Sequence, residues 1–197
     1  MKRHFWGVGT GIVLLFGLLA VLPKAVGRFV VQEAALAAQE AVRYANDLGL
    51  SEIQVVSYPK TTRSIYPLLA AKCSKCHSLS RILNAPYAEP NGKDFAEKKK
   101  RAEALRKSNP DLFSDKNVWQ IGPDVWETQI KRMMVKPGAG ISRSEGRQIL
   151  EFLVYDSNRR KLGKDKKEWA KYRRGLLTQF KEKYPRQYQE FYGGAGK

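Results

Sequence analysis

Residues 73–77 read Cys73-Ser74-Lys75-Cys76-His77, a C-x-x-C-H pentapeptide that holds both cysteines of the chain and one of its two histidines. The other histidine is His4. Two cysteines in 197 residues exclude a disulfide-rich secreted scaffold. Two histidines exclude a His-rich metal site, and a catalytic triad would have to use one of them. The distinctive chemistry of the chain is therefore concentrated in five consecutive residues.

This spacing is typical of c-type haem attachment. Two thiols separated by two residues on one helical turn can each form a thioether with a haem vinyl group, and the adjacent imidazole can then bind the iron as proximal ligand. A thioredoxin-like redox pair belongs in a βαβ setting, and a zinc site needs a fourth ligand that the chain does not offer. We therefore expect one covalent haem c on Cys73 and Cys76, with His77 on the iron.

Two methionines are the candidates for the second axial ligand. His4 and Met1 lie at the far end of the apolar segment that begins the chain, so neither can reach the haem if that segment spans a membrane. On a helix, Met133 is rotated by about 20° from Trp126, whereas Met134 is rotated by about 80°. Met133 is therefore the expected ligand. If both methionines only fill the core, the iron keeps a water, a lysine or an open position.

Helical signals surround the pentapeptide between residues 64 and 155. Ser64 is a candidate N-cap for a helix that leads into the cysteines. Pro123-Asp124 opens a second helix, which stops at Pro137, and Ser142 with Glu145 forms a capping box for a third. No alternating pattern is long enough for a sheet. The predicted fold class is therefore all-α.

The chain from about residue 65 to residue 155 resembles a monohaem class I cytochrome c domain. In that family a helix leads into C-x-x-C-H, and the distal methionine precedes a final helix that packs across the first. Met133, the segment 136–142 and the segment 149–153 are similar to these parts. The resemblance implies a small haem domain over residues 64–155, on the outer side of a bacterial energy-transducing membrane. It also implies that the carbonyl of Pro86 accepts the Nδ1–H of His77.

The start of the chain predicts a membrane anchor. Residues 5–22 carry no formal charge, and as a helix of about 27 Å they come close to the ~30 Å hydrocarbon core. We expect an uncleaved transmembrane signal anchor over residues 1–27, then a helical stalk and connector over residues 28–63 with Gly49 as the stalk's C-terminal cap. A cleaved signal peptide is the alternative, since Ala25-Val26-Gly27 loosely resembles a cleavage site.

The end of the chain predicts a basic amphipathic extension over residues 156–197. Large apolar side chains recur there at helical spacing, namely Trp169, Tyr172, Leu176, Phe180 and Tyr184. A cytochrome c fold is already closed by its terminal helix, so this apolar stripe has no evident place in the haem core. We expect it to dock on another subunit or on the membrane interface. The alternative is packing against this chain's own residues 28–46.

Charge and composition restrict the partners. The chain has 36 Lys and Arg against 19 Asp and Glu, a net charge of +17, and such a field suits anionic lipid or an acidic face of a redox partner. Nucleic acid is discounted, because an exported cytochrome would not meet it. A basic patch over residues 93–107, within a polar insertion, has a solvated helix face as its simplest interpretation.

The expected function is one-electron transfer by a membrane-anchored subunit of a respiratory or photosynthetic complex, in the bacterial inner membrane with its haem domain in the periplasm. With His77 and Met133 on the iron, no small-molecule substrate can reach it, and no acid–base pair or nucleophile accompanies the haem motif. We therefore expect an electron-transfer protein and not an enzyme. The alternatives are a haem enzyme or gas sensor with an open iron site, and a mainly structural assembly subunit.

Overall fold

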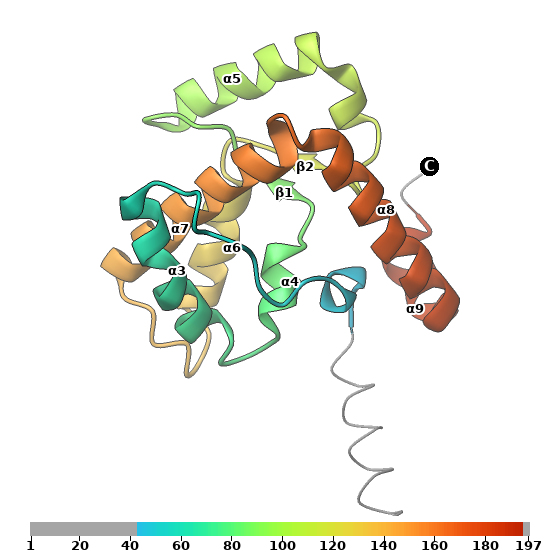
Figure 1. Cartoon of the computed structure of the whole chain (residues 1–197), viewed down its shortest axis with the longest axis horizontal. Coiled ribbons are helices and arrows are strands. Elements are labelled where there is room, and N and C mark those ends of the chain that lie inside the picture. Colours follow the sequence, from blue (N-terminus) through green and yellow to red (C-terminus); the bar gives the residue numbers. More distant parts are fainter. Residues whose placement is uncertain (1–42, 195–197) are drawn as a thin grey trace, which may run out of the picture. The chain divides into compact units, whose positions relative to one another are not determined.

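Helix α3 (Lys60–Cys73) leads directly into the C-x-x-C-H pentapeptide and lies against helix α7 (Arg143–Ser157). Figure 1 shows this pair within the computed structural model, which describes residues 43–194 of the chain. Side chains from both helices form the core, among them Leu69, Ile149 and Phe152, each at most 2% exposed. Burying each of these side chains contributes about 1.5–3 kcal/mol. The helix that ends at Cys73 is therefore held by the helix predicted to pack across it.

Helix α6 (Val125–Met134) completes this three-helix core by packing against α7. It begins after Asp124, as predicted, and buries Trp126 and Ile130 on the side that faces the core. The capping box at the start of α7 is also confirmed, since Ser142 Oγ accepts from Glu145 N at 3.2 Å while Ser142 N donates to Glu145 Oε2 at 2.8 Å. These local signals were sufficient to place both helices.

The predicted start of α3 is wrong. The helix begins at Lys60 with Pro59 as its N-cap, so Ser64 lies within the first turns and donates its hydroxyl to the carbonyl of Thr61 at 2.8 Å. Pro59 has a φ of −50° and a ψ of 143°, so it lies just outside the helix, where its missing N–H costs no helical hydrogen bond. The N-cap is therefore five residues earlier in the chain than the serine that the sequence suggested.

The segment between α3 and α6 contains the helix α5 (Phe95–Ser108) and the short elements α4 (Leu79–Leu83), β1 (Tyr87–Ala88), η2 (Pro110–Phe113) and β2 (Gln120–Ile121). The two strands pair in parallel, with Tyr87 opposite Gln120. A purely all-α class is thus corrected to a mostly helical domain with a minimal parallel sheet. Strands of two residues are too short to produce an alternating pattern, so the sequence could not reveal them.

The predicted fold class is also corrected in its membrane part. Within residues 43–194, no helix is both long and apolar enough to cross a membrane. The expected span, residues 5–22, lies outside the described residues, as do the 1–27 anchor and residues 28–42 of the expected stalk and connector. The described end of the stalk is a 3-10 turn, η1 (Ala45–Leu48), which ends at Gly49.

Gly49 is needed there for space. It has a φ of −86°, which any residue can adopt. A Cβ atom at this position would lie 2.4 Å from Cγ of Asn84 and 2.6 Å from the hydroxyl of Tyr172. The predicted cap is therefore a point of close approach between η1, α4 and the C-terminal part of the chain.

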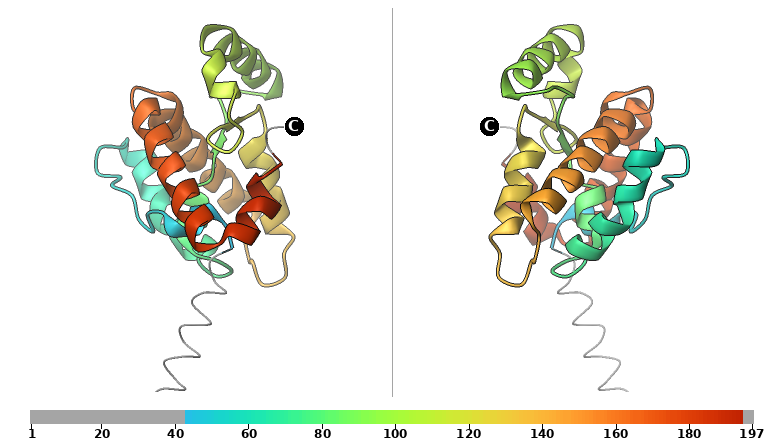
Figure 2. Two further views of the ribbon diagram at one scale, coloured as in Figure 1. Left: turned by 90° about the vertical axis from the view of Figure 1, so that its right-hand side faces the viewer. Right: turned by 90° about the vertical axis from the view of Figure 1, so that its left-hand side faces the viewer.

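The C-terminal part of the chain packs onto the same compact unit as the three-helix core. After a π-helical turn, η3 (Asn158–Leu162), helix α8 (Lys166–Lys183) lies against η1 and η3, and α9 (Pro185–Tyr192) folds back on α8, as the two views of Figure 2 show. Trp169, Leu176 and Phe180 are buried. The prediction that this apolar stripe docks outside the domain is therefore wrong, because η1 and η3 cover it.

Candidate functional site

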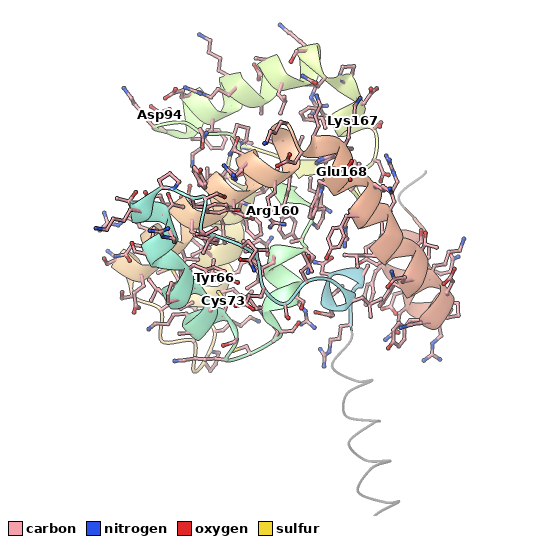
Figure 3. All side chains as sticks on the ribbon, in the orientation of Figure 1. Tyr66, Cys73, Asp94, Arg160, Lys167 and Glu168 are labelled. Atoms are coloured by element: carbon pink, nitrogen blue, oxygen red, sulfur yellow. The ribbon has the colours of Figure 1, made fainter. Side chains whose placement is uncertain are left out.

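A cavity of about 640 Å³ opens between the end of α3, α4, α6 and α7. All four predicted site residues line it, namely Cys73, Cys76, His77 and Met133. Cys73 lies at the end of α3, as labelled in Figure 3. The volume falls within the range of about 300–1,000 Å³ that is usual for small-molecule and cofactor sites. His77 and Met133, which are 56 positions apart in the sequence, thus meet at one cavity.

The two cysteines are free thiols in different surroundings. Cys73 is half-buried as the last residue of α3, and Cys76 is exposed in the turn that follows. Burial, with a smaller contribution from Cys76, raises the pKa of the Cys73 thiol to about 11. Cys73 is therefore protonated at neutral pH, so it is a weak nucleophile in the folded chain without activation.

His77 is oriented by the backbone next to it. Its Nδ1–H donates to the carbonyl of Ser78 at 3.1 Å, which leaves the lone pair of Nε2 free to bind a metal. The predicted acceptor, the carbonyl of Pro86, instead accepts from the backbone N–H of Gln120 at 2.8 Å beside the β1–β2 pair. Ser78 therefore replaces Pro86 as the residue that fixes the imidazole tautomer.

The two neighbouring methionines face different parts of the molecule. Met133 lines the cavity. Met134 packs against the core and points at α7, where its sulfur lies 2.8 Å from the place that a Cβ atom on Gly146 would occupy. Successive residues on a helix are 100° apart, so one helix presents Met133 to the cavity and Met134 to the adjoining core.

The walls of the cavity are apolar, with two unpartnered polar atoms among them. Ile130, Ile149 and Leu153 supply the apolar surface. Nε1 of Trp126 and Oδ1 of Asn46 are buried there with no hydrogen-bond partner. Buried polar groups nearly always have a partner, and an indole N–H suits a carboxylate. A largely apolar macrocycle with carboxylate side groups, such as haem, fits these residues.

The loop from α6 to α7 closes one side of the cavity and is tied to α3. Gly138 and Gly140 have φ values of 77° and 56°, a region that residues with a side chain rarely adopt. Lys72 donates to the carbonyl of Gly140 at 2.6 Å and pairs with Glu145 at 2.8 Å. Lys72 and the backbone of Ser142 lower the pKa of Glu145 to about 2. The loop after Met133 is thus linked to the helix that carries Cys73.

The cavity also carries basic side chains, which are Lys72, Arg81, Arg132 and Lys136. Asp47 pairs with Arg81 at 2.8 Å, and that contact lowers the pKa of the aspartate against the opposing effect of its burial. No acidic side chain lines the cavity within residues 43–194. Lys72 and Arg81 are paired with Glu145 and Asp47, so the excess positive charge among the lining residues comes from Arg132 and Lys136.

Comparison with family models, with curated proteins and with solved structures gives no match for the chain. In residues 43–194, no group of three or more His, Cys, Asp or Glu side chains is placed to hold a metal ion. Sequence patterns pointed to Cys73, Cys76, His77 and Met133. They did not point to Asn46, which reaches the cavity from a distant segment and has no local signature.

Proposed function

We propose that this chain is an electron-transfer protein that binds one haem c covalently and passes single electrons to and from partner proteins. The observation that carries the proposal is the meeting of Cys73, Cys76, His77 and Met133 on one apolar cavity of about 640 Å³. These are two thiols, an imidazole and a thioether, the groups that attach and ligate haem in c-type cytochromes. The resemblance to class I cytochromes c points the same way.

Each residue has a defined part in this arrangement. The thiols of Cys73 and Cys76 would hold a haem by adding across its two vinyl groups, with each C–S bond formed as the thiol hydrogen goes to the other vinyl carbon and no oxidant consumed. Nε2 of His77 and the sulfur of Met133 would ligate the iron. The haem would supply a one-electron change at that iron. With both ligands drawn from side chains, no site would remain for a substrate, so the proposed protein is not an enzyme.

The basic side chains around the cavity support an acidic redox partner. Arg132 and Lys136 line the opening, and the whole chain has a net charge of +17. Complementary charge steers a partner to the surface from which an electron can leave. We place the haem domain on the periplasmic side of a bacterial inner membrane, within a respiratory or photosynthetic complex, because the resemblance implies haem attachment there. Nucleic acid and small-molecule substrates are not proposed partners.

The deciding experiment is expression of the full chain in cells that carry the c-type haem attachment machinery. We expect haem that stays with the polypeptide in denaturing gels and adds the mass of one haem. Cys73→Ala and Cys76→Ala should each leave at most one thioether, whereas the matched control Ser74→Ala, between them in the sequence, should leave both. Haem that is absent, or that is lost from the wild type on denaturation, would overturn the proposal.

Ligand binding separates electron transfer from the open-site alternative. A six-coordinate iron with His77 and Met133 should give a low-spin spectrum and resist carbon monoxide in the reduced protein. A haem enzyme or gas sensor would be high-spin and bind carbon monoxide at once. Rapid binding to the native protein would therefore replace the proposed function with that alternative.

A further inference from the structure

Lys161 lies behind the wall of the cavity and is completely buried. It belongs to η3, next to Arg160, which Figure 3 labels between α7 and α8. Its Nζ donates to the carbonyl of Ala85 at 2.7 Å and to the carbonyl of Tyr87 at 3.0 Å. Lysine is almost never fully buried unless it is paired, so this position calls for a physical reason.

The same ammonium group lies between two indole rings. It is 5.1 Å from the ring centroid of Trp126 and 4.8 Å from that of Trp169, distances at which a cation is attracted to the face of a ring. Trp126 belongs to α6 and Trp169 to α8. Lys161 therefore joins the helix that carries Met133 to the C-terminal helix.

Three of the groups that Lys161 contacts are parts of the cavity wall. Ala85, Tyr87 and Trp126 all line the cavity, and the rings of Tyr87 and Trp126 meet edge to face at 5.2 Å. Lys161 itself does not line the cavity. It holds the wall from behind by two hydrogen bonds and one ring contact.

Stability alone does not account for a lysine here. Within residues 43–194, the structure gives Lys161 no carboxylate partner, because Asp156, the nearby acid, is bound by Tyr58 at 2.7 Å and by Arg160 at 2.5 Å. Burial strongly lowers the pKa of Lys161, and Arg160 adds to the effect, whereas Asp156 acts in the opposite direction. The two carbonyl acceptors and the two indole rings around Nζ favour the charged ammonium form. Apolar residues that replace buried charges often leave stability unchanged or higher. The group is therefore better explained by what it does to its neighbours.

We propose that Lys161 is a positioning residue that fixes Trp126 and the Ala85–Tyr87 segment against the haem, and that its buried positive charge raises the reduction potential of the iron. This inference rests on the proposed function. A positive charge in the interior disfavours the oxidised iron, which carries one more positive charge than the reduced iron. In general, two unit charges about 10 Å apart at an effective dielectric constant of about 20 interact strongly enough to shift a one-electron equilibrium roughly tenfold.

The test is the reduction potential of the haem-loaded full chain with Lys161→Gln, which keeps a donor for the two carbonyls and removes the charge. We expect the reduction equilibrium to shift about tenfold toward the oxidised form, which is about 59 mV for one electron. Lys161→Met should shift the equilibrium as far and, in addition, change the tryptophan fluorescence of the protein, because the two carbonyl contacts are lost.

Arg173→Gln is the matched control. Arg173 is also a fully buried cation, but its Nε donates to the carbonyl of Asn117 at 2.9 Å, and neither residue lines the cavity. We expect a clearly smaller shift in this variant. An unchanged potential in Lys161→Gln, or equal shifts in Lys161→Gln and Arg173→Gln, would overturn the inference while leaving the haem function intact. If Lys161→Met fails to fold, the glutamine variant still decides. A wild-type chain without covalent haem would instead refute the proposed function itself.

Discussion

At the scale of single residues, Met133 and Met134 differ most sharply in their surroundings. Met133 lines the cavity, and Met134 packs beside Gly146 on α7. A thioether sulfur on haem iron keeps the iron low-spin and raises its reduction potential. Substituting each methionine in turn therefore tests which sulfur binds the iron.

Met133→Ala should turn the reduced haem protein high-spin and lower its potential, as measured by visible spectra during a redox titration. Met134→Ala is the control on the same helix, and it should keep the wild-type spectrum while destabilising the fold by about 2 kcal/mol, at the low end for deletion of a core methionine. A high-spin spectrum in the Met134 variant alone would show that the ligand is Met134.

Part of this site could be predicted because its signals are local. Cysteines three residues apart, the adjacent His77 and the helical phase of Met133 are all visible within short windows of sequence. The partner of His77 was predicted wrongly, since Pro86 is engaged by Gln120 and Ser78 is closer to the imidazole. Asn46 and Lys161 were not predicted, because contacts between distant segments leave no pattern in the sequence.

At the scale of elements, the Lys72–Glu145 pair links α3 to the start of α7. The pKa of Glu145 is lowered from 4.5 to about 2. A carboxyl whose pKa is lower in the folded state contributes stability above about pH 4.5, and that contribution is lost as the pH falls through 4.5 toward 2. The contact between these helices should therefore weaken in acid.

Glu145→Gln should remove this part of the acid sensitivity. Urea denaturation at pH 7 and at pH 3 should give a smaller difference in unfolding free energy for the variant than for the wild type. Glu151→Gln, at an exposed position on the same helix, should retain the wild-type difference. Equal pH dependence in all three proteins would contradict a role for Glu145.

A second link between elements is the buried carboxylate of Glu89. It pairs with Lys98 of α5 at 2.6 Å, and its other oxygen accepts from the backbone N–H of Trp126 at 2.8 Å, at the start of α6. α5 contributes no buried residue of its own. Lys98 is therefore the charged contact that ties the basic insertion to the helix of Met133.

Lys98→Met should destabilise the protein by about 3 kcal/mol, because removal of one partner leaves a buried carboxylate uncompensated. Lys99→Met, at the exposed neighbouring position, should have an effect within about 0.5 kcal/mol. Chemical denaturation measures both. A Glu89→Gln/Lys98→Met double variant should recover part of the loss, and a double variant as unstable as the sum of the single variants would show that the pair is not coupled.

At the scale of the whole molecule, the C-terminal helices are part of the domain that encloses the cavity. The helical stripe in α8 was predicted correctly from its spacing. The surface against which α8 packs was predicted wrongly, because a cytochrome c fold closed by its terminal helix offers this helix no evident place. In the structure, α8 packs against η1 and η3, which carry the buried residues Ala45 and Lys161. A short 3-10 turn and a π-helical turn give no sequence pattern that would have revealed an acceptor for α8.

Truncation after Leu162 should therefore lower the melting temperature markedly, since it removes four large buried apolar side chains, those of Trp169, Leu176, Leu177 and Phe180, each worth about 1.5–3 kcal/mol. Domains of this size have a total stability of about 5–15 kcal/mol. The deletion also removes Trp169, one of the two rings that enclose Lys161, so the haem of the truncated chain should also be less protected from solvent. Circular dichroism melts and haem spectra measure the two effects.

Phe180→Ala, at a fully buried position of α8, should reproduce about 3–5 kcal/mol of the loss without shortening the chain, whereas Gln179→Ala, at the exposed neighbouring position, should not. A truncated chain that melts at the wild-type temperature and keeps its haem spectrum would show that α8 is dispensable for the domain and would restore docking on another protein as its purpose.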